Sequence, residues 1–232
     1  GKPVKEDDME TKYYLAIDIG ASSGRHIVGW REDFNFSFQI HTTGQLEAAA
    51  YLNRLGAAVS RPIRVSGHSK GGNFAVYAAA FCESSVQERI LRIYANDAPG
   101  FHQTLASSPE IRRALDKTSV VIPESSLVGI LLSTKEEKHI IRSNAGGLYQ
   151  HNPYTWQILG PEFESADSRS ASSLFMDETL HRWAASLDDS QRADFVQALF
   201  GAMESSGAKT MHELKSDPLA AINAMTAAIR SM

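Results

Sequence analysis

One serine occupies a position from which it could act as a nucleophile. Ser69 is the centre of a G-x-S-x-G pattern at 67–71, preceded by a β-branched run at 63–65 and followed by an alanine-rich segment at helical spacing from Asn73 to Cys82. A strand, a sharp turn and a helix in this order hold a serine hydroxyl on a strained bend, where glycines two residues away avoid crowding. The helix N-terminus favours the negative charge of an acyl-transfer intermediate. The pattern therefore predicts that Ser69 attacks an acyl carbon.

A serine nucleophile needs a base to take its proton and an acid to hold that base in the right tautomer. Among the eight histidines, His151 is the best candidate for the base, because it lies in a loop after the last predicted strand. His102 and His139 are the alternative candidates. Two carboxylates, Asp97 and Glu124, directly follow predicted strands. Asp97 has the alternative interpretation of an Asx-type turn residue, and Glu124 that of a solvated loop carboxylate.

An oxyanion formed by this attack needs hydrogen-bond donors. The backbone N–H of Lys70 follows the nucleophile directly and is one donor by geometry, whatever its side chain does. The Lys70 side chain is expected to be solvated, with binding of an acidic substrate group as the alternative.

Strands that alternate with helices must position these residues. We expect an α/β fold of the α/β-hydrolase type, in which helices flank a mostly parallel sheet and reactive groups gather at the carboxyl ends of strands. Residues 1–170 are predicted to form this core, and 171–232 a helical C-terminal extension packed on it. The predicted strands are 13–19, 63–65, 91–95, 119–122 and 138–143. The predicted helices are 44–57, 73–84, 86–91 (a short helix or the tail of the preceding one), 109–115, 172–187, 189–205 and 218–229.

Composition narrows the function. The chain has 232 residues, 43% hydrophobic and 22% charged, with a net charge of −4 and one cysteine. A negative charge without a basic stripe argues against nucleic-acid binding. No apolar run approaches the roughly 20 residues that span a bilayer, so a cytoplasmic protein is expected. The chemistry above requires neither a metal nor an organic cofactor, and the oligomeric state stays open.

From about Ile27 the sequence resembles a family of uncharacterised bacterial lipase-like α/β-hydrolases, distantly similar to the fungal-type triglyceride lipases. The resemblance rests on the elbow around Ser69, on Gly29-Trp30-Arg31-Glu32-Asp33, and on a His-x-Pro-Tyr segment at 151–154. It implies a serine hydrolase that cleaves an ester of a small-molecule or lipid-like substrate, with His151 as base and Glu124 favoured as acid. The family's oxyanion turn is replaced here by Gly20-Ala21-Ser22-Ser23, so Ser22 or Ser23 is the implied second donor.

The opening of the chain points elsewhere. Met9 to Trp30 resembles the N-terminus of rhamnulokinases, in which an Asp-x-Gly-x-Ser-Ser-x-Arg pattern starts a phosphate-binding hairpin; here the pattern reads Asp18, Gly20, Ser22, Ser23, with Arg25 displaced by one. Residues 1–30 are thus an atypical, kinase-like opening. Two alternatives to a hydrolase follow: a non-catalytic α/β-hydrolase scaffold, and a sugar-kinase-like ATP binder.

Overall fold

The computed structural model of the protein describes residues 13–17, 27–132, 136–205, 207 and 213. At its centre, five parallel strands lie side by side in the order β1-β2-β3-β4-β5. Parallel neighbours require crossover connections, and helices supply them between the first four strands. The strands are β1 (Tyr13–Ile17), β2 (Ile63–His68), β3 (Ile90–Asn96), β4 (Thr118–Pro123) and β5 (Lys138–Ile141). The expected α/β class, with a mostly parallel sheet and flanking helices, is confirmed.

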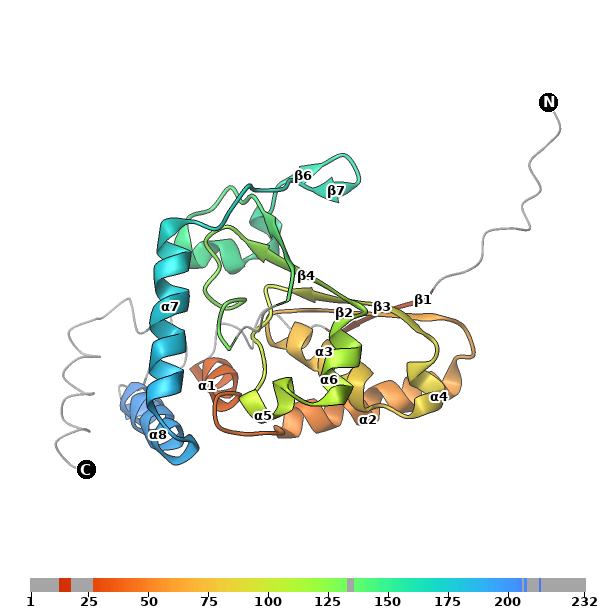
Figure 1. The fold of residues 1–232 in the computed structure, drawn as a ribbon, viewed down its shortest axis with the longest axis horizontal. Coiled ribbons are helices and arrows are strands. Elements are labelled where there is room, and N and C mark those ends of the chain that lie inside the picture. Colours follow the sequence, from red (N-terminus) through yellow and green to blue (C-terminus); the bar gives the residue numbers. More distant parts are fainter. Residues whose placement is uncertain (1–12, 18–26, 133–135, 206, 208–212, 214–232) are drawn as a thin grey trace.

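The helices between strands lie mainly on one side of the sheet (Figure 1). Several start where the sequence predicts, because polar caps satisfy their first N–H groups: Thr42 and Gln45 form a capping box, and Ser108 caps a helix that begins with a proline. The helices are α1 (Ile27–Asn35), α2 (Thr43–Ala58), α3 (Lys70–Phe81), α4 (Ser84–Gln87), α5 (Gln103–Ala106) and α6 (Pro109–Leu115).

Several expected boundaries are wrong: the strand expected at 63–65 runs on to His68, the strand expected at 138–143 ends at Ile141, and two expected helical segments are too long. Helix α3 ends at Phe81, because Cys82 takes an extended conformation (ψ 170°). The stretch 86–91 is not one helix: α4 ends at Gln87, and Ile90 already pairs with Ile63 in the sheet. Strand pairing therefore claims the second half of a segment that was expected to be helical.

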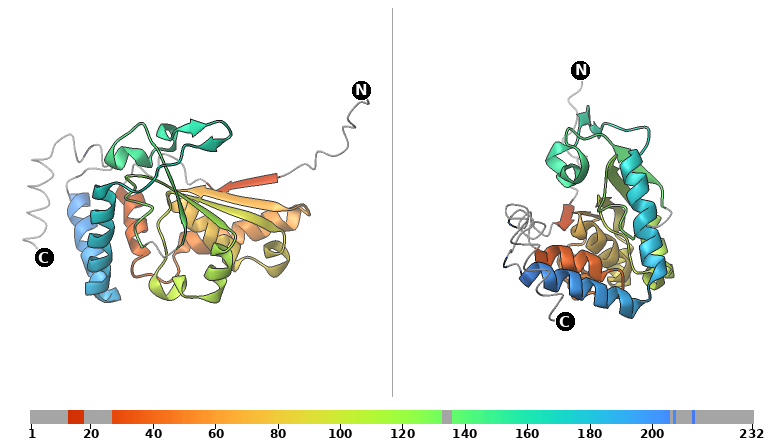
Figure 2. Two further views of the ribbon diagram at one scale, coloured as in Figure 1. Left: turned by 45° about the horizontal axis from the view of Figure 1, so that its top comes forward. Right: turned by 90° about the vertical axis from the view of Figure 1, so that its left-hand side faces the viewer.

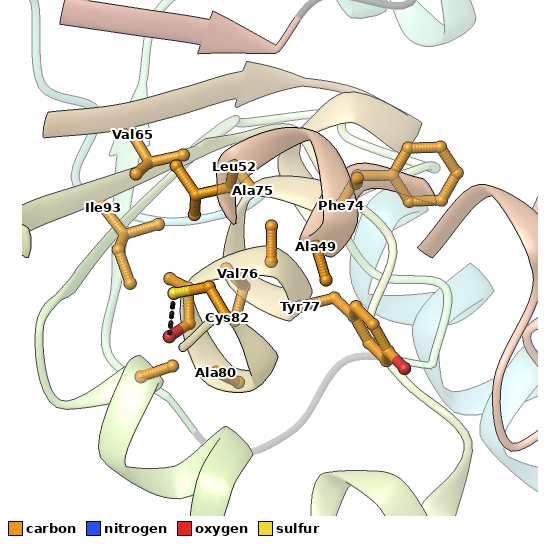
Figure 3. Packing of buried hydrophobic residues seen from close by; sticks show 14 of the residues in the cluster. Ala49, Leu52, Val65, Phe74, Ala75, Val76, Tyr77, Ala80, Cys82 and Ile93 are labelled. Carbon is orange, nitrogen blue, oxygen red and sulfur yellow. Dashed lines mark hydrogen bonds between the residues drawn. The ribbon is translucent and has the colours of Figure 1, made fainter. Parts of the chain in front are cut away.

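Helix α3 lies at the centre of the hydrophobic core, between the sheet and α2 (Figure 3). Every residue from Lys70 to Ala80 is buried. Its alanines let the flanking layers approach closely, and the larger side chains Phe74 and Tyr77 fill the space beside α2. Burial raises the pKa of Cys82 to about 11, which marks this thiol as a packing residue.

After β5 the chain forms short elements and then two long helices. The short ones, which the sequence did not predict, are η3 (Gly147–His151), η4 (Pro153–Thr155), β6 (Ile158–Leu159) and β7 (Glu162–Phe163). The long ones are α7 (Ala171–Ser186) and α8 (Asp189–Ser205). Helix α8 runs beside α1 (Figure 2), where Val196 and Phe200 pack with Trp30 and Phe34. The predicted helix 218–229 lies outside the described residues.

Candidate active site

Ser69 stands where the sequence places it, between the end of β2 and the start of α3. Its φ of 57° and ψ of −136° lie in a region of backbone conformation that residues other than glycine rarely adopt. Its N–H donates to the Asn96 carbonyl at 2.9 Å, which fixes the bend against the neighbouring strand. The serine is also the N-cap residue of α3 without a side-chain capping bond, so its hydroxyl is free for other partners.

The bend depends on close backbone contact that only glycine permits. A Cβ atom on Gly67 would lie 2.0 Å from the Gly71 carbonyl oxygen. A Cβ on Gly72 would lie 2.6 Å from the Cβ of Ala98. The first glycine of the pattern therefore lets strand and helix meet, as the sequence predicts. Gly72, outside the pattern, admits the loop that follows β3.

His151 lies beside Ser69 although 82 residues separate the two along the chain. Its Nε2 is 2.9 Å from Ser69 Oγ, and its Nδ1 is 2.7 Å from Asp97 Oδ2. An ionised carboxylate only accepts hydrogen bonds, so Nδ1 carries the proton and Nε2 can accept the serine hydroxyl proton. This is the tautomer that a general base needs.

Asp97 is the carboxylate that reaches the imidazole. It directly follows β3, is fully buried and has a φ of 45°, which turns the chain sharply. Its Oδ1 accepts hydrogen bonds from the Ser126 hydroxyl and, at 3.1 Å, from the Gly129 N–H. With His151 on the other oxygen, three donors surround it, as a buried carboxylate requires.

Glu124 does not occupy that place. The loop after β4 reaches the carboxylate through Ser126, two residues further along. Glu124 itself uses backbone groups, since its N–H donates to the Ile141 carbonyl and its carbonyl accepts from the Ser170 N–H. Of the two carboxylates that the sequence leaves open, the structure brings only Asp97 to His151.

Three hydrogen bonds hold the loop that carries His151. His68 Nε2 lies 2.8 Å from the His151 carbonyl oxygen, and the two rings are 4.7 Å apart. Trp156 donates its indole N–H to the Gln150 carbonyl at 2.7 Å, and the Gln150 side chain accepts from the Ser125 N–H. Sequence reasoning missed these supports, although aromatic and amide residues on either side of a candidate base are the signal that could have found them.

The Lys70 side chain departs from expectation, because it is buried rather than solvated. Its Nζ donates to the Gly29 carbonyl at 2.6 Å and to Glu32 Oε2 at 3.0 Å. Both acceptors belong to α1, so no acidic substrate group is needed to explain this cation. The Lys70 backbone N–H stands one residue after Ser69, as required of an oxyanion donor. The proposed second donors, Ser22 and Ser23, lie outside the described residues.

Helix α1 lies beside the imidazole of His151. The Trp30 ring centroid is 6.4 Å from that of His151. Asp33, one turn further along α1, is only 6% exposed, and within the described part of the chain its Oδ1 has no hydrogen-bond partner. Burial raises the pKa of Asp33 to about 7, although electrostatic interactions with Lys70 and with the protonated form of His151 act in the opposite direction.

The other candidate bases lie in different surroundings. His102 Nε2 is 3.2 Å from Asp189 Oδ1, and this hydrogen bond lowers the pKa of Asp189. His139 Nε2 is 2.8 Å from Ser165 Oγ. Neither is paired with Ser69 there. Across the described ranges, no group of three or more histidine, cysteine or acidic residues is arranged to hold a metal ion.

Comparison with known proteins gives one match. A family model described as Mbeg1-like matches residues 15–201, so the match begins before Ile27 and overlaps most of the segment that resembles a kinase. No curated protein and no solved structure matches this chain. Within the described residues, none of the helices combines the length and the apolar character needed to cross a bilayer.

Proposed function

The chain belongs to the Mbeg1-like family, which is lipase-like, and from this premise we propose that it is a serine hydrolase that cleaves acyl esters. The observation that carries the proposal is the pair of hydrogen bonds that joins Ser69 to His151 and His151 to Asp97. Three side chains that lie far apart in the sequence meet in the order and tautomer that acyl transfer requires.

Ser69 is the nucleophile in this proposal. Its Oγ attacks the ester carbonyl carbon while His151 Nε2 takes the hydroxyl proton, and the carbonyl π electrons move onto oxygen to give a tetrahedral oxyanion. Asp97 stabilises the imidazolium ion that forms and keeps the ring in place. The Lys70 N–H and the N-terminal end of α3 stabilise the oxyanion, and Ser22 or Ser23 provides the second donor.

The acyl-enzyme forms when the carbon–oxygen bond to the leaving alcohol breaks. His151 returns its proton to the departing alkoxide, so the alcohol leaves neutral. Water then attacks the acyl carbon with His151 again as base, and the proton finally passes to Ser69 Oγ as the carboxylic acid is released. The two half-reactions consume one water and regenerate the enzyme, so this mechanism uses no metal or organic cofactor.

The proposal includes the architecture. We assign 1–170 to an α/β-hydrolase core and 171–232 to a helical extension packed on it. The strand–serine–helix bend at 63–81 supports the first assignment. The contact of α8 with α1 supports the second. A small-molecule or lipid-like ester is the proposed substrate class.

Labelling with a fluorophosphonate probe tests the chemistry. We expect the wild type to be labelled and Ser69→Ala to remain unlabelled. The exposed Ser85→Ala is the matched control and should be labelled like the wild type. A wild type that the probe does not modify, or a Ser69→Ala variant modified at the same rate, would leave a scaffold without catalysis.

The acid is tested by a second pair of variants. Asp97→Asn should slow labelling by about 10³–10⁴-fold, because the asparagine amide favours the wrong imidazole tautomer. Glu124→Gln should leave the rate near that of the wild type, since the hydrogen bond to the ring comes from Asp97. The reverse ranking would return the acid role to Glu124.

A further inference from the structure

The buried ammonium group of Lys70 points to α1 and away from the Ser69 hydroxyl. The Lys70 backbone belongs to the turn that presents Ser69, but its side chain, 6% exposed, runs to α1. There the ammonium group meets one neutral acceptor, the Gly29 carbonyl, and one charged acceptor, Glu32. The two acceptors lie three residues apart, on one turn of α1, so a single ammonium contacts this helix at two points.

The Lys70 ammonium group is buried, whereas its partner Glu32 is 35% exposed, so the main cost of this pair is the desolvation of the ammonium group. Removing an ammonium group from water costs more than a surface ion pair returns, and apolar replacements of buried pairs are often tolerated or stabilising. What such a pair supplies is a defined geometry, because its hydrogen bonds have short and directional optima. Here the geometry concerns the distance between α1 and the turn at Ser69.

Helix α1 carries a side chain that contacts the base. Trp30 lies between the two acceptors in the sequence, and its ring is tilted by 49° against the His151 imidazole. One turn further along the same face of α1, Phe34 packs on α8 against Phe200, with the two rings 5.7 Å apart, and Trp30 belongs to the same apolar cluster. Apolar packing of this kind tolerates small sliding movements, whereas the hydrogen bonds from Lys70 do not.

We propose that Lys70 is a positioning residue whose ammonium group fixes α1 relative to Ser69 and thereby keeps Trp30 against the His151 ring. This inference rests on the proposed function, because it matters only where His151 acts as a base. A substitution of Lys70 keeps the backbone N–H in place, so its effect reports the side chain alone.

The test compares Lys70→Met, Lys70→Arg and a matched control in the full chain. Lys117 also donates its Nζ to a backbone carbonyl, that of Ile90 at 3.1 Å, but lies away from the site, so Lys117→Met is the control. Two quantities are measured in each protein: the rate of fluorophosphonate labelling, and hydrogen exchange of the amides in 27–35.

We expect Lys70→Met to label about ten- to a hundredfold more slowly, because small displacements of catalytic groups are costly. Its amides in α1 should exchange about tenfold faster, with those of β2 and β3 unchanged. Lys70→Arg, which keeps the cation, should recover part of both losses, and Lys117→Met should match the wild type in both.

The possible failures are distinguishable. If Ser69-dependent labelling holds but Lys70→Met labels at the wild-type rate, or α1 exchanges as before, the positioning role is wrong and the proposed function stands. If the wild type is not labelled, both proposals fall. A variant that unfolds would lose protection in β2 and β3 as well, and loss of protection throughout the sheet would assign Lys70 to overall stability instead.

Discussion

At the scale of single residues, the site contrasts two buried aspartates. Asp97 is surrounded by three hydrogen-bond donors. Asp33 has an oxygen without a partner in the described part of the chain, and burial raises its pKa. The fold therefore surrounds one carboxylate with hydrogen-bond donors and, within the described residues, leaves an oxygen of the other unpartnered, which favours the protonated form of Asp33.

Asp33 should make stability depend on pH. Its pKa is about 7 in the folded protein against the ordinary 3.8. Between these values the folded state keeps a proton that the unfolded state loses, so stability falls as pH rises through this window. Asp33→Asn removes that loss and should gain on the order of 2–4 kcal/mol over wild type at pH 8, with little gain at pH 4.

Urea denaturation at the two pH values measures this difference. Asp116→Asn, at an exposed position, is the control and should show no such pH-dependent gain. An Asp33→Asn variant whose advantage over wild type is the same at both pH values would mean that Asp33 does not titrate in this window.

At the scale of elements, the strand–turn–helix unit from β2 to α3 combines a tight bend with a helix that is buried from Lys70 to Ala80. At its glycines, neighbouring atoms lie so close to the backbone that a Cβ atom would clash with them. Because α3 is packed on every side, the unit cannot relax outward to make room for an added methyl group.

Gly67→Ala should therefore be severely destabilising. The added Cβ would meet the Gly71 carbonyl at 2.0 Å, and we expect a loss of about 3 kcal/mol or more in the free energy of unfolding. Gly146→Ala is the matched control, because that glycine has a φ of −113° and open space around it. Its change should stay within about 0.5 kcal/mol in the same denaturation experiment. Equal losses in the two variants would contradict the close-approach argument.

Local pattern explains what can be predicted from the sequence. The bend at Ser69 is visible because a β-branched run, glycines and an alanine-rich helix all lie within twenty residues or so. The parallel sheet follows from alternating strands and helices. In contrast, the choice between Asp97 and Glu124 depends on the left-handed backbone of Asp97 and on the reach of Ser126, which no local pattern encodes. The burial of Lys70 depends on where α1 lies, a matter of long-range packing.

At the scale of the whole molecule, the C-terminal helix α8 packs on α1, the helix that lies beside His151. Helix α8 packs on α1 through Phe200, which is 1% exposed and contacts Phe34 edge to face. The same α1 presents Trp30 to His151. Helix α8 thus supports the site indirectly, through α1, although in the described part of the chain none of its residues contacts Ser69, Asp97 or His151.

Phe200→Ala should cost about 3–5 kcal/mol of stability, the usual price of emptying a buried aromatic site. Phe195 lies on the same helix but is 43% exposed and contacts Trp183, so Phe195→Ala should cost no more than about 1.5 kcal/mol. Chemical denaturation of both variants measures the difference. If the two losses are alike, α8 is held to the body of the protein by something other than its contact with α1.

The five strands lie in the sheet in the order in which the chain is synthesised. During translation each strand can pair with a neighbour that has already left the ribosome. Ser69 and Asp97 emerge directly after β2 and β3, whereas His151 emerges only after β5. A nascent chain thus presents the Ser69 hydroxyl long before it gains the His151 imidazole, and the hydrogen-bonded set of three side chains can close only when the sheet is complete.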